Sequence, residues 1–294
     1  MERIESVRAL QARADAVRAA GQRIGLVPTM GALHEGHLSL VRSARERSDQ
    51  VWVSIFVNPT QFNDPKDLDG YPRTLESDLA ACREAGVDLV FLPDAAEMYP
   101  EGADTFVEVE ALSRPLCGAS RPGHFRGVTT IVAKLFLVAK PHVAVFGQKD
   151  FQQLALIRRM ARDLCFDVEV VGAPTVREAD GLALSSRNLN LDAEARSQAL
   201  VLSRALDAAE AAVAAGERDG ARLLATVRAE VAKAPRGELD YAELRHPDDL
   251  SPAPTTLDGP TLLALAVFMH PAVPPAEQRH TVRLIDNRVL LAQA

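Results

Sequence analysis

The hydrophobic positions in the first 175 residues follow two spacings. Short continuous apolar runs, rich in β-branched residues, are typical of strands buried on both faces of a sheet. Between these runs, apolar residues recur every three or four positions, which is typical of helices that bury one face. We predict strands over residues 24–27, 51–57, 87–92, 142–146 and 166–171. We predict helices over residues 5–20, 38–44, 75–85, 127–139 and 150–164.

This alternation predicts an α/β fold. Strands that alternate with helices pair in parallel through right-handed crossovers and form a doubly wound sheet. Ligands of such sheets bind beyond the carboxyl ends of the strands. Three polar clusters follow predicted strands, so we expect them to share one edge of the sheet: residues 28–37, 58–61 and 147–150.

The pattern changes after about residue 175. A polar segment, residues 177–188, leads into Ala-rich helical sequence. We predict two helices near 193–215 and 219–233, and short strands at 241–245, 262–268 and 281–285. We therefore divide the chain into a doubly wound domain over residues 1–175 and a second, smaller α+β domain over residues 176–294.

Composition and charge narrow the classes of function. The chain has 294 residues, enough for one large or two modest domains. Its net charge of −7 disfavours nucleic acid as a partner. Its three scattered cysteines argue against a disulfide framework or a thiolate zinc site and fit a reducing compartment. The start is charged and no apolar run is long enough for a bilayer, so we predict neither a signal peptide nor a membrane span, and a cytoplasmic protein.

The segment from Pro28 to His37 is the richest in candidate chemistry. It lies between a predicted strand and a predicted helix, and Gly31 and Gly36 allow a ligand to approach the backbone closely. A helix N-terminus carries unpaired N–H groups and a partial positive charge that attract phosphate. His34 and His37 can add hydrogen bonds to phosphate oxygens. They can equally be structural histidines at a helix start or part of a zinc site, although no third ligand stands at a recognisable spacing.

Two further clusters combine hydrogen-bond donors with positive charge. Lys149 lies between Gly147 and Asp150, where a predicted strand gives way to a helix, and it can reach phosphate while Asp150 accepts ribose hydroxyls. Ser185 to Arg187 offer two hydroxyls and a guanidinium, which suit a triphosphate. Taken alone, each cluster is also compatible with an ordinary surface turn.

Three glutamines, Gln61, Gln152 and Gln153, stand at the predicted ends of strands and helices. Their amides can hold hydroxyls and carboxylates without adding charge. We find no Ser-His-Asp or Cys-His set that would supply a covalent nucleophile. This favours phosphoryl or nucleotidyl transfer, which depends mainly on positioning and charge stabilisation.

The chain carries seven motifs in a fixed order. They are Pro-Thr-Met-Gly-Ala-Leu-His-Glu-Gly-His (28–37), Phe-Val-Asn-Pro-Thr-Gln-Phe (56–62), Tyr-Pro-Arg-Thr (71–74), Arg-Pro-Gly-His-Phe-Arg-Gly-Val (121–128), Phe-Gly-Gln-Lys-Asp-Phe-Gln-Gln (146–153), Asp-Gly-Leu-Ala-Leu-Ser-Ser-Arg-Asn (180–188) and Arg-Leu-Ile-Asp-Asn (283–287). Together they resemble the pantothenate synthetase (pantoate–β-alanine ligase) family of the His-x-Gly-His nucleotidyltransferase superfamily. The resemblance runs from about residue 20 to about residue 290.

The resemblance implies a reaction. The enzyme would join D-pantoate to β-alanine and convert ATP to AMP and pyrophosphate through a pantoyl adenylate, with Mg²⁺ carried by the nucleotide. Members of this family are cytoplasmic and usually homodimeric. Their fold is a Rossmann-like N-terminal domain with a smaller C-terminal domain that closes over ATP.

The resemblance also implies roles for the matching residues. His37 would be the catalytic acid, with His34, Lys149 and Arg187 as the other catalytic residues. Gln61 and Gln153 would hold pantoate, Gln61 would also meet β-alanine, and no residue would bind a metal directly. The ATP site would comprise Met30, Gly31, Ala32, Leu33, His34, Glu35, Gly36, His37, Gly147, Gln148, Lys149, Asp150, Val176, Leu184, Ser185, Ser186 and Arg187. Of these, residues 184–187 stand in the place of the mobile Lys-Met-Ser-Lys-Ser loop of related synthetases.

Two positions depart from the family pattern. Gln148 stands where many members have Glu, and residues 268–280 form a longer, Pro-rich connection where members usually have a short turn. We further expect Pro28, Met30 and Phe62 to form an apolar wall for the gem-dimethyl group of pantoate. The Asn-, Pro- and Asp-rich residues 60–75 are predicted to act as a lid.

Three rival functions share some of these features. A nucleotidyltransferase acting on a phosphorylated vitamin precursor would need an additional cationic cluster for the second phosphate. A nucleotide sensor would bind ATP without turnover, which the three phosphate-facing clusters disfavour. An aminoacyl-tRNA synthetase is disfavoured by the acidic chain and by the lack of a recognisable RNA-binding domain.

Overall fold

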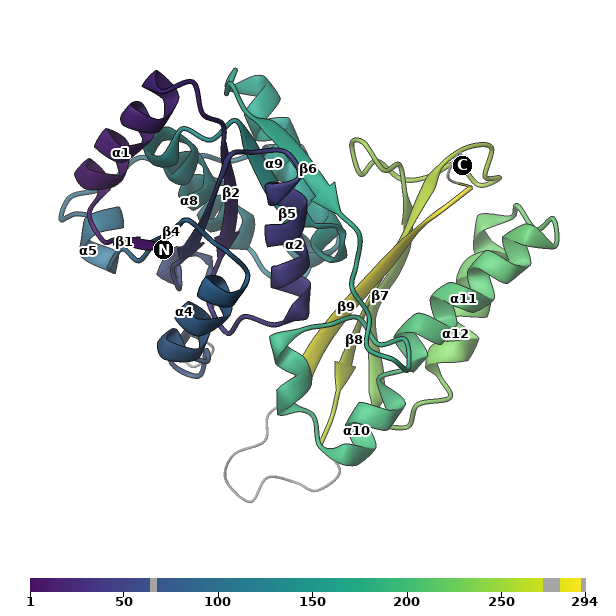
Figure 1. The fold of residues 1–294 in the computed structure, drawn as a ribbon. Helices are drawn as coiled ribbons and strands as arrows, with labels where there is room; N and C mark the ends of the chain where they lie inside the picture. Colours follow the sequence, from purple (N-terminus) through teal and green to yellow (C-terminus); the bar gives the residue numbers. More distant parts are fainter. Residues whose placement is uncertain (64–67, 272–280, 292–294) are drawn as a thin grey trace. The chain divides into compact units, whose positions relative to one another are not determined.

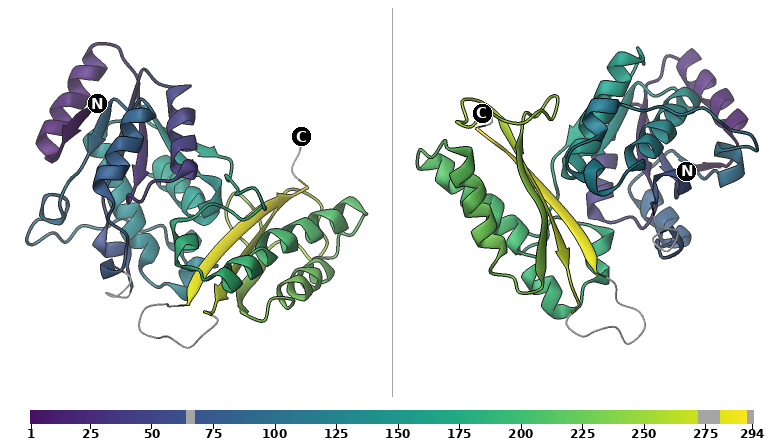
Figure 2. Two further views of the ribbon diagram at one scale, coloured as in Figure 1. Left: turned by 60° about the horizontal axis from the view of Figure 1, so that its bottom comes forward. Right: turned by 180° about the vertical axis from the view of Figure 1, so that it is seen from behind.

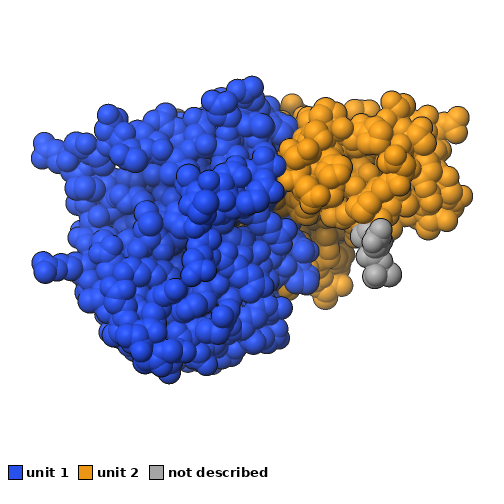
Figure 3. All heavy atoms as spheres, turned by 90° about the horizontal axis from the view of Figure 1, so that it is seen from above, with its two compact units in different colours: residues 1–148, 152–174 blue, residues 149–151, 175–294 orange. Residues whose placement is uncertain are grey.

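The computed structural model describes residues 1–63, 68–271 and 281–291. The chain divides into two compact units, coloured blue and orange in Figure 3. The large unit comprises residues 1–148 and 152–174, and the small unit comprises residues 149–151 and 175–294.

Two predicted features fall partly outside the described residues. Residues 64–67 belong to the predicted lid, and residues 272–280 make up most of the Pro-rich connection.

The large unit is built on a six-stranded sheet whose pairings are all parallel (Figure 1). Side by side across the sheet, the strands are β1 (Glu2–Ile4), β4 (Leu89–Phe91), β3 (Gln50–Ile55), β2 (Ile24–Thr29), β5 (Val143–Gly147) and β6 (Glu169–Ala173). Chain order runs outward from β2 through β3 and β4 on one side, and through β5 and β6 on the other. The predicted doubly wound, Rossmann-like sheet is thus confirmed, and its switch point lies between β2 and β5.

Helices follow the strands of this sheet in the chain. They are α1 (Val7–Ala19), α2 (Glu35–Arg45), α4 (Leu75–Glu84), α5 (Ala95–Met98), α6 (Glu110–Ser113), α7 (Cys117–Ser120), α8 (His124–Ala139) and α9 (Phe151–Asp163), with 3₁₀ turns η1 (Pro59–Gln61) and η2 (Gln148–Asp150). The apolar faces of α2 and α4 form one buried cluster with valines of β2 to β5. Helices α1 and α8 pack against each other and against β2. Burial by helices explains why the strands have continuous apolar sequences.

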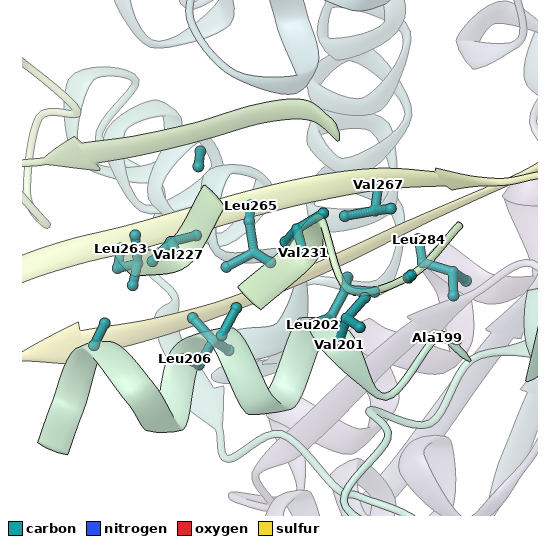
Figure 4. Packing of buried hydrophobic residues seen from close by; sticks show 14 of the residues in the cluster. Ala199, Val201, Leu202, Leu206, Val227, Val231, Leu263, Leu265, Val267 and Leu284 are labelled. Carbon is teal, nitrogen blue, oxygen red and sulfur yellow. The ribbon is translucent and has the colours of Figure 1, made fainter. Parts of the chain in front are cut away.

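The small unit packs helices on an antiparallel sheet. Its elements are η3 (Ser186–Asn190), α10 (Ala193–Gln198), α11 (Val201–Ala214), α12 (Gly220–Val231), β7 (Gly237–Arg245), β8 (Thr261–Met269) and β9 (Val282–Leu290). The strand order is β7-β8-β9, and α11 and α12 lie along the same face (Figure 2). Side chains of α11, such as Leu202 and Leu206, point toward Leu263 and Leu265 of β8 (Figure 4). The predicted smaller α+β arrangement is confirmed.

Two elements differ from the sequence prediction. Strand β1 pairs with β4 at the sheet edge and was not predicted, because only Ile4 of its three residues is buried. The predicted helix over residues 193–215 is interrupted at Ala199–Leu200. Buried Ala195, Ala199, Leu202 and Leu206 keep helical spacing across the break, so the hydrophobic pattern could not show it.

Candidate functional site

The strand order brings the candidate segments of the large unit to one edge of the sheet. Strands β3, β2 and β5 are neighbours, and all three run parallel. Residues 56–61 follow β3, residues 30–34 follow β2, and Gly147 ends β5. These carboxyl ends flank the switch point, the usual place for a ligand in an open α/β sheet.

His34 and His37 meet where α2 begins. His34 is the N-cap residue, and its Nδ1 accepts a hydrogen bond from the backbone N–H of Gly36 at 3.1 Å. In return, Nδ1 of His37 accepts from the backbone N–H of His34 at 3.3 Å. The ring centroids lie 4.2 Å apart. The two imidazoles therefore form a reciprocal helix cap, a task that Ser and Glu perform in many helices.

This cap fixes the position of the proton on each neutral ring. A ring nitrogen that accepts a hydrogen bond carries no proton, so Nε2 carries the N–H in both histidines. We expected the backbone N–H groups at this helix start to meet phosphate. Instead, the backbone N–H groups of His34 and Gly36 donate to Nδ1 of the two imidazoles. The hydrogen-bond donors that the rings present to a ligand are then their Nε2–H groups, which lie further from the backbone.

A buried carboxylate holds the loop between β2 and α2. Asp78, in the first turn of α4, is only 3% exposed and accepts hydrogen bonds from the backbone N–H groups of Ala32 (3.0 Å) and Leu33 (2.8 Å). Thr74 donates its hydroxyl to the same carboxylate at 3.2 Å. Gly31 has φ +84°, and a Cβ there would lie 2.9 Å from Oδ2 of Asp78, so the position requires glycine.

Sequence reasoning missed Asp78, although a signal was present. It precedes buried Leu79 and lies four residues before buried Cys82, on the face of α4 that packs into the core. A carboxylate at such a position must have hydrogen-bond partners, because burial without them is costly. Its partners turn out to be the loop predicted to bind ATP.

Two of the predicted substrate residues, Met30 and Gln61, lie in contact. Nε2 of Gln61 is 3.0 Å from Sδ of Met30, and Oε1 of Gln61 accepts from Nδ2 of Asn58 at 3.1 Å. Asn58 is 1% exposed and accepts from the hydroxyl of Tyr99 at 2.8 Å. Because Asn58 occupies the amide oxygen of Gln61, the donor end of that amide faces Met30. An apolar wall beside an amide donor suits a small polar molecule with methyl groups.

The remaining predicted wall residues lie in the same unit. Pro28 belongs to β2, and Phe62 packs edge-to-face with Tyr71, with ring centroids 5.7 Å apart. Whether they contact pantoate stays a prediction.

The motif over residues 121–128 clamps the backbone of Gln61. Nδ1 of His124 lies 2.8 Å from the carbonyl oxygen of Gln61, and Arg121 donates to the same oxygen at 3.3 Å. Gly127 lets α8 approach η1, because a Cβ at this position would lie 2.4 Å from the carbonyl oxygen of Thr60. Gln61 is thus held through both its side chain and its main chain.

The glutamines after β5 have different surroundings. Gln152 is 6% exposed and bonds to three backbone groups of residues 112–117, at 2.7 to 3.0 Å, so it has a structural role. Gln153, the predicted pantoate residue, is half-buried. Nε2 of Gln148 donates to the carbonyl of Gly172 on β6 at 3.4 Å. That bond draws the side chain of Gln148 toward β6, and its contact with ATP stays a prediction.

In the small unit, residues 176–184 form a tight hairpin. The backbone N–H of Leu184 donates to the carbonyl of Val176 at 2.9 Å, and Arg177 pairs with Ala183 in an antiparallel bridge. Gly181, with φ +97°, lies in the turn. The predicted ATP residues Val176 and Leu184 are therefore joined by a backbone hydrogen bond.

The predicted phosphate residues after this hairpin lie in a short 3₁₀ turn, η3. Oγ of Ser185 accepts from the backbone N–H of Arg187 at 3.3 Å, which caps the turn. Arg187 itself is exposed. Asn188 donates to Glu178 of the hairpin at 2.8 Å, and Glu178 also pairs with Arg196 at 2.6 Å.

Lys149 and Asp150 belong to the small unit by their contacts, although they follow β5 directly in the chain. Lys149 is half-buried and Asp150 is exposed. Their side chains can therefore meet a ligand at the surface of that unit.

A comparison of the sequence with known protein families identifies its relationship. The family model described as Pantoate-beta-alanine ligase matches residues 2–289. The chain belongs to this family.

Named relatives match the sequence of this pantoate–β-alanine ligase over nearly its whole length. Pantothenate synthetase from Syntrophobacter fumaroxidans is 53% identical over 290 residues, which cover 99% of each chain. Pantothenate synthetase from Geotalea daltonii is 52% identical over 290 residues, with the same coverage.

Solved structures of the family share its fold. Pantothenate synthetase from Thermus thermophilus matches with a TM-score of 0.89 and 45% identity, over 98% of this chain and 99% of that one. Pantoate-beta-alanine ligase from Francisella tularensis, complexed with beta-gamma ATP and beta-alanine, matches with a TM-score of 0.77 and 32% identity, over 98% and 97% of the two chains.

The described residues of this ligase lack two features. No group of three or more His, Cys, Asp or Glu side chains there could hold a metal ion. No helix within residues 1–63, 68–271 and 281–291 is long and apolar enough to cross a membrane.

Proposed function

We propose that this ligase condenses D-pantoate with β-alanine through a pantoyl-adenylate intermediate, and that the residues described above carry out the two steps. Membership of the family supports ATP-dependent ligation of these substrates. The observation that carries the site assignment is the reciprocal cap of His34 and His37, which makes both Nε2 atoms donors where β2 ends.

In the first step, a carboxylate oxygen of pantoate attacks the α-phosphorus of ATP. The bond from that phosphorus to the bridging oxygen breaks, and pyrophosphate leaves with the electron pair. Negative charge gathers on the phosphate oxygens, where donors aimed in advance are most effective. We assign this task to His34, His37, Lys149 and Arg187, with His37 as the proton donor.

In the second step, the amine of β-alanine attacks the acyl carbon. The bond between that carbon and the AMP oxygen breaks, AMP leaves, and the amine loses a proton as the amide forms. Gln61 and Gln153 hold pantoate during both steps, and the amide donor of Gln61 also meets β-alanine. The hold of Asn58 and His124 on Gln61 supports this role, because a preoriented amide loses little entropy on binding.

Each unit carries some of the residues proposed to bind ATP. The large unit supplies residues 30–37 together with Gly147 and Gln148. The small unit supplies Lys149, Asp150, Val176 and residues 184–187. We propose the boundary between the two domains at residues 175–176, with the smaller domain closing over ATP as the family resemblance implies.

Three further properties belong to the proposal. Mg²⁺ enters with the nucleotide and neutralises charge on its phosphates. The ligase works in the cytoplasm. It assembles as a homodimer.

Incubations of the purified protein with different sets of substrates test the proposed reaction. Purified protein is mixed with ATP, Mg²⁺, pantoate and β-alanine, and pantothenate is sought by mass spectrometry. Pantoate alone should support exchange of labelled pyrophosphate into ATP, whereas AMP should accumulate over many turnovers only when β-alanine is added. Release of pyrophosphate with an adenylylated phosphate ester as product, and without free AMP, would favour the plain nucleotidyltransferase. ATP binding without either reaction would favour the sensor.

A further inference from the structure

The motif Arg-Leu-Ile-Asp-Asn (283–287) contains none of the residues proposed to contact the substrates or the nucleotide. It lies on β9, an edge strand of the small unit's sheet. Successive side chains of a strand point to opposite faces of the sheet. Asp286 and Asn287 therefore reach different neighbours, although they are adjacent in sequence.

Asp286 anchors the hairpin over residues 176–184. Its side chain is 1% exposed and forms a two-point ion pair with the guanidinium of Arg177, at 2.7 and 2.9 Å. The same guanidinium donates to the carbonyl of Gly181 at 3.0 Å and so spans the hairpin. These hydrogen bonds with Asp286 raise the pKa of Arg177 above its usual value despite desolvation. A bidentate pair of this kind, with a buried carboxylate, fixes direction as well as distance.

Asn287 anchors the backbone of Lys149. Its Nδ2 donates to the carbonyl oxygen of Lys149 at 2.8 Å. This contact lies within the small unit, to which Lys149 belongs. The bond fixes the point from which the lysine side chain starts.

We propose that Asp286 and Asn287 are positioning residues for ATP, which set the hairpin 176–184 and the backbone of Lys149 at fixed places on one strand. This inference rests on the proposed function, because it takes Lys149, Val176 and Leu184 as nucleotide contacts. Strand β9 pairs with β8 along its whole length, so it is a rigid base for both segments. Neither residue needs to touch the nucleotide.

The test separates the two anchors and does not depend on turnover. Hydrogen exchange is measured in Asn287→Ala and Asp286→Asn, together with the dissociation constant for the non-hydrolysable analogue in which a methylene group joins the β- and γ-phosphates. Loss of one hydrogen bond corresponds to a change of about 3- to 10-fold. In Asn287→Ala we expect exchange to rise by about that factor in residues 149–153 alone, and the analogue to bind about 3- to 10-fold more weakly. In Asp286→Asn we expect faster exchange in residues 176–188 alone, and a larger loss of affinity.

Arg288→Gln is the matched control. Arg288 follows Asn287 on the same strand but pairs with Asp207 and Glu210 of α11, at 2.7 and 2.6 Å. We expect its affinity for the analogue to stay within about 2-fold of the wild-type value, since its ion pairs are with α11 and not with the hairpin 176–184 or Lys149.

The outcomes distinguish the positioning role of Asp286 and Asn287 from the proposed reaction. Wild-type exchange and affinity in Asn287→Ala would overturn the positioning role, even if Asp286→Asn fails to fold, and would leave the proposed reaction untouched. The expected changes in a protein that makes no pantothenate would refute the reaction and keep the positioning role. A wild-type protein that does not bind the analogue would overturn the positioning role as well.

Discussion

The two loops assigned to the nucleotide are held in different ways. Residues 30–37 of the large unit are fixed from beneath by the buried carboxylate of Asp78, and their helix start is capped by two imidazoles. Residues 184–190 of the small unit lie on the surface, with Arg187 exposed and Leu189 84% exposed. Hydrogen bonds from Asn188 to Glu178 and to the carbonyl of Ala183, and a backbone bond to Val176, tie this loop to its hairpin.

This difference indicates that the two loops have different functions. Groups that must be aimed before the charge develops belong on a loop whose backbone is already fixed, since reorganisation during the reaction costs free energy. Groups that must let substrates enter and products leave belong on a loop with few buried contacts. We expect the loop over residues 30–37 to be preformed. We expect the loop over residues 184–190 to become ordered when the nucleotide binds.

The largest effect is expected at the preformed loop. His37→Ala should lower pantoate-dependent exchange of pyrophosphate into ATP by about 10² to 10³, the usual loss for a donor that stabilises the transition state. His37→Asn should lose as much activity, yet retain the helix cap, because an Asn oxygen can accept the bond from the His34 N–H.

A histidine at the amino end of β5, away from the carboxyl ends of the strands, supplies the control. His142 precedes β5, and its Nδ1 accepts from the backbone N–H of Ile24 at 3.0 Å. His142→Asn should exchange pyrophosphate at nearly the wild-type rate. Near-normal exchange in His37→Asn would remove His37 from the catalytic residues.

The carboxylate of Asp78, which holds the loop over residues 30–37, should contribute measurably to the free energy of unfolding. Asp78→Ala leaves the N–H groups of Ala32 and Leu33 without their acceptor, and we expect a loss of about 3 kcal/mol in the free energy of unfolding. Urea denaturation measures it. Asp78→Asn keeps one acceptor oxygen and should lose less, and exposed Glu76→Ala in the same helical turn should stay within about 0.5 kcal/mol. An Asp78→Ala protein as stable as wild type would show that the loop does not depend on this carboxylate.

Buried Cys82 of α4 should make the free energy of unfolding depend on pH in the alkaline range. Burial, and next the nearby carboxylate of Asp78, raise the pKa of Cys82 from 9.0 to about 11. The folded protein thus keeps a proton that the unfolded chain loses, so this contribution to stability is complete below pH 9 and is lost between pH 9 and 11. Wild type should lose about 2 to 3 kcal/mol more than Cys82→Ala over that range in urea titrations. Parallel losses in the two proteins would contradict the shift.

The smallest effects concern the exposed loop. Binding of the methylene analogue of ATP should slow hydrogen exchange in residues 184–190 by about 5-fold or more, and change exchange in residues 30–37 by less than about 2-fold. Leu189→Ser should alter the free energy of unfolding by less than about 0.5 kcal/mol, because its side chain is almost fully exposed. Equal protection of both loops would remove the contrast between them.

Much of the fold could be predicted because its signals are local. The apolar runs of β2, β3 and β5 and the helical spacing of α2 are visible in short windows of sequence. Alternation of these elements then predicts the parallel sheet and places the candidate segments at its carboxyl edge. The three-residue strand β1 was missed because it buries one side chain and depends on pairing with distant β4.

The candidate site was predictable in its residue types but not in their partners. The sequence indicated His34 and His37, yet not that Nδ1 of each ring would accept a backbone N–H at the start of α2. It indicated Gln61, yet not that Asn58, His124 and Arg121 would orient it. These partners come from segments up to 63 residues away, and no local pattern specifies them.

Sequence by itself determined the order of elements, the family and the set of polar side chains near the strand ends, because periodicity and motif order are properties of the chain. Tertiary structure decided which of those groups are already bound and which nitrogen of each ring carries the proton. It also decided which neighbours, such as Asp78 and Asn287, set the backbone beneath the candidate site. The physical reason is that a buried polar group must find its hydrogen-bond partner wherever folding places one, however distant in sequence.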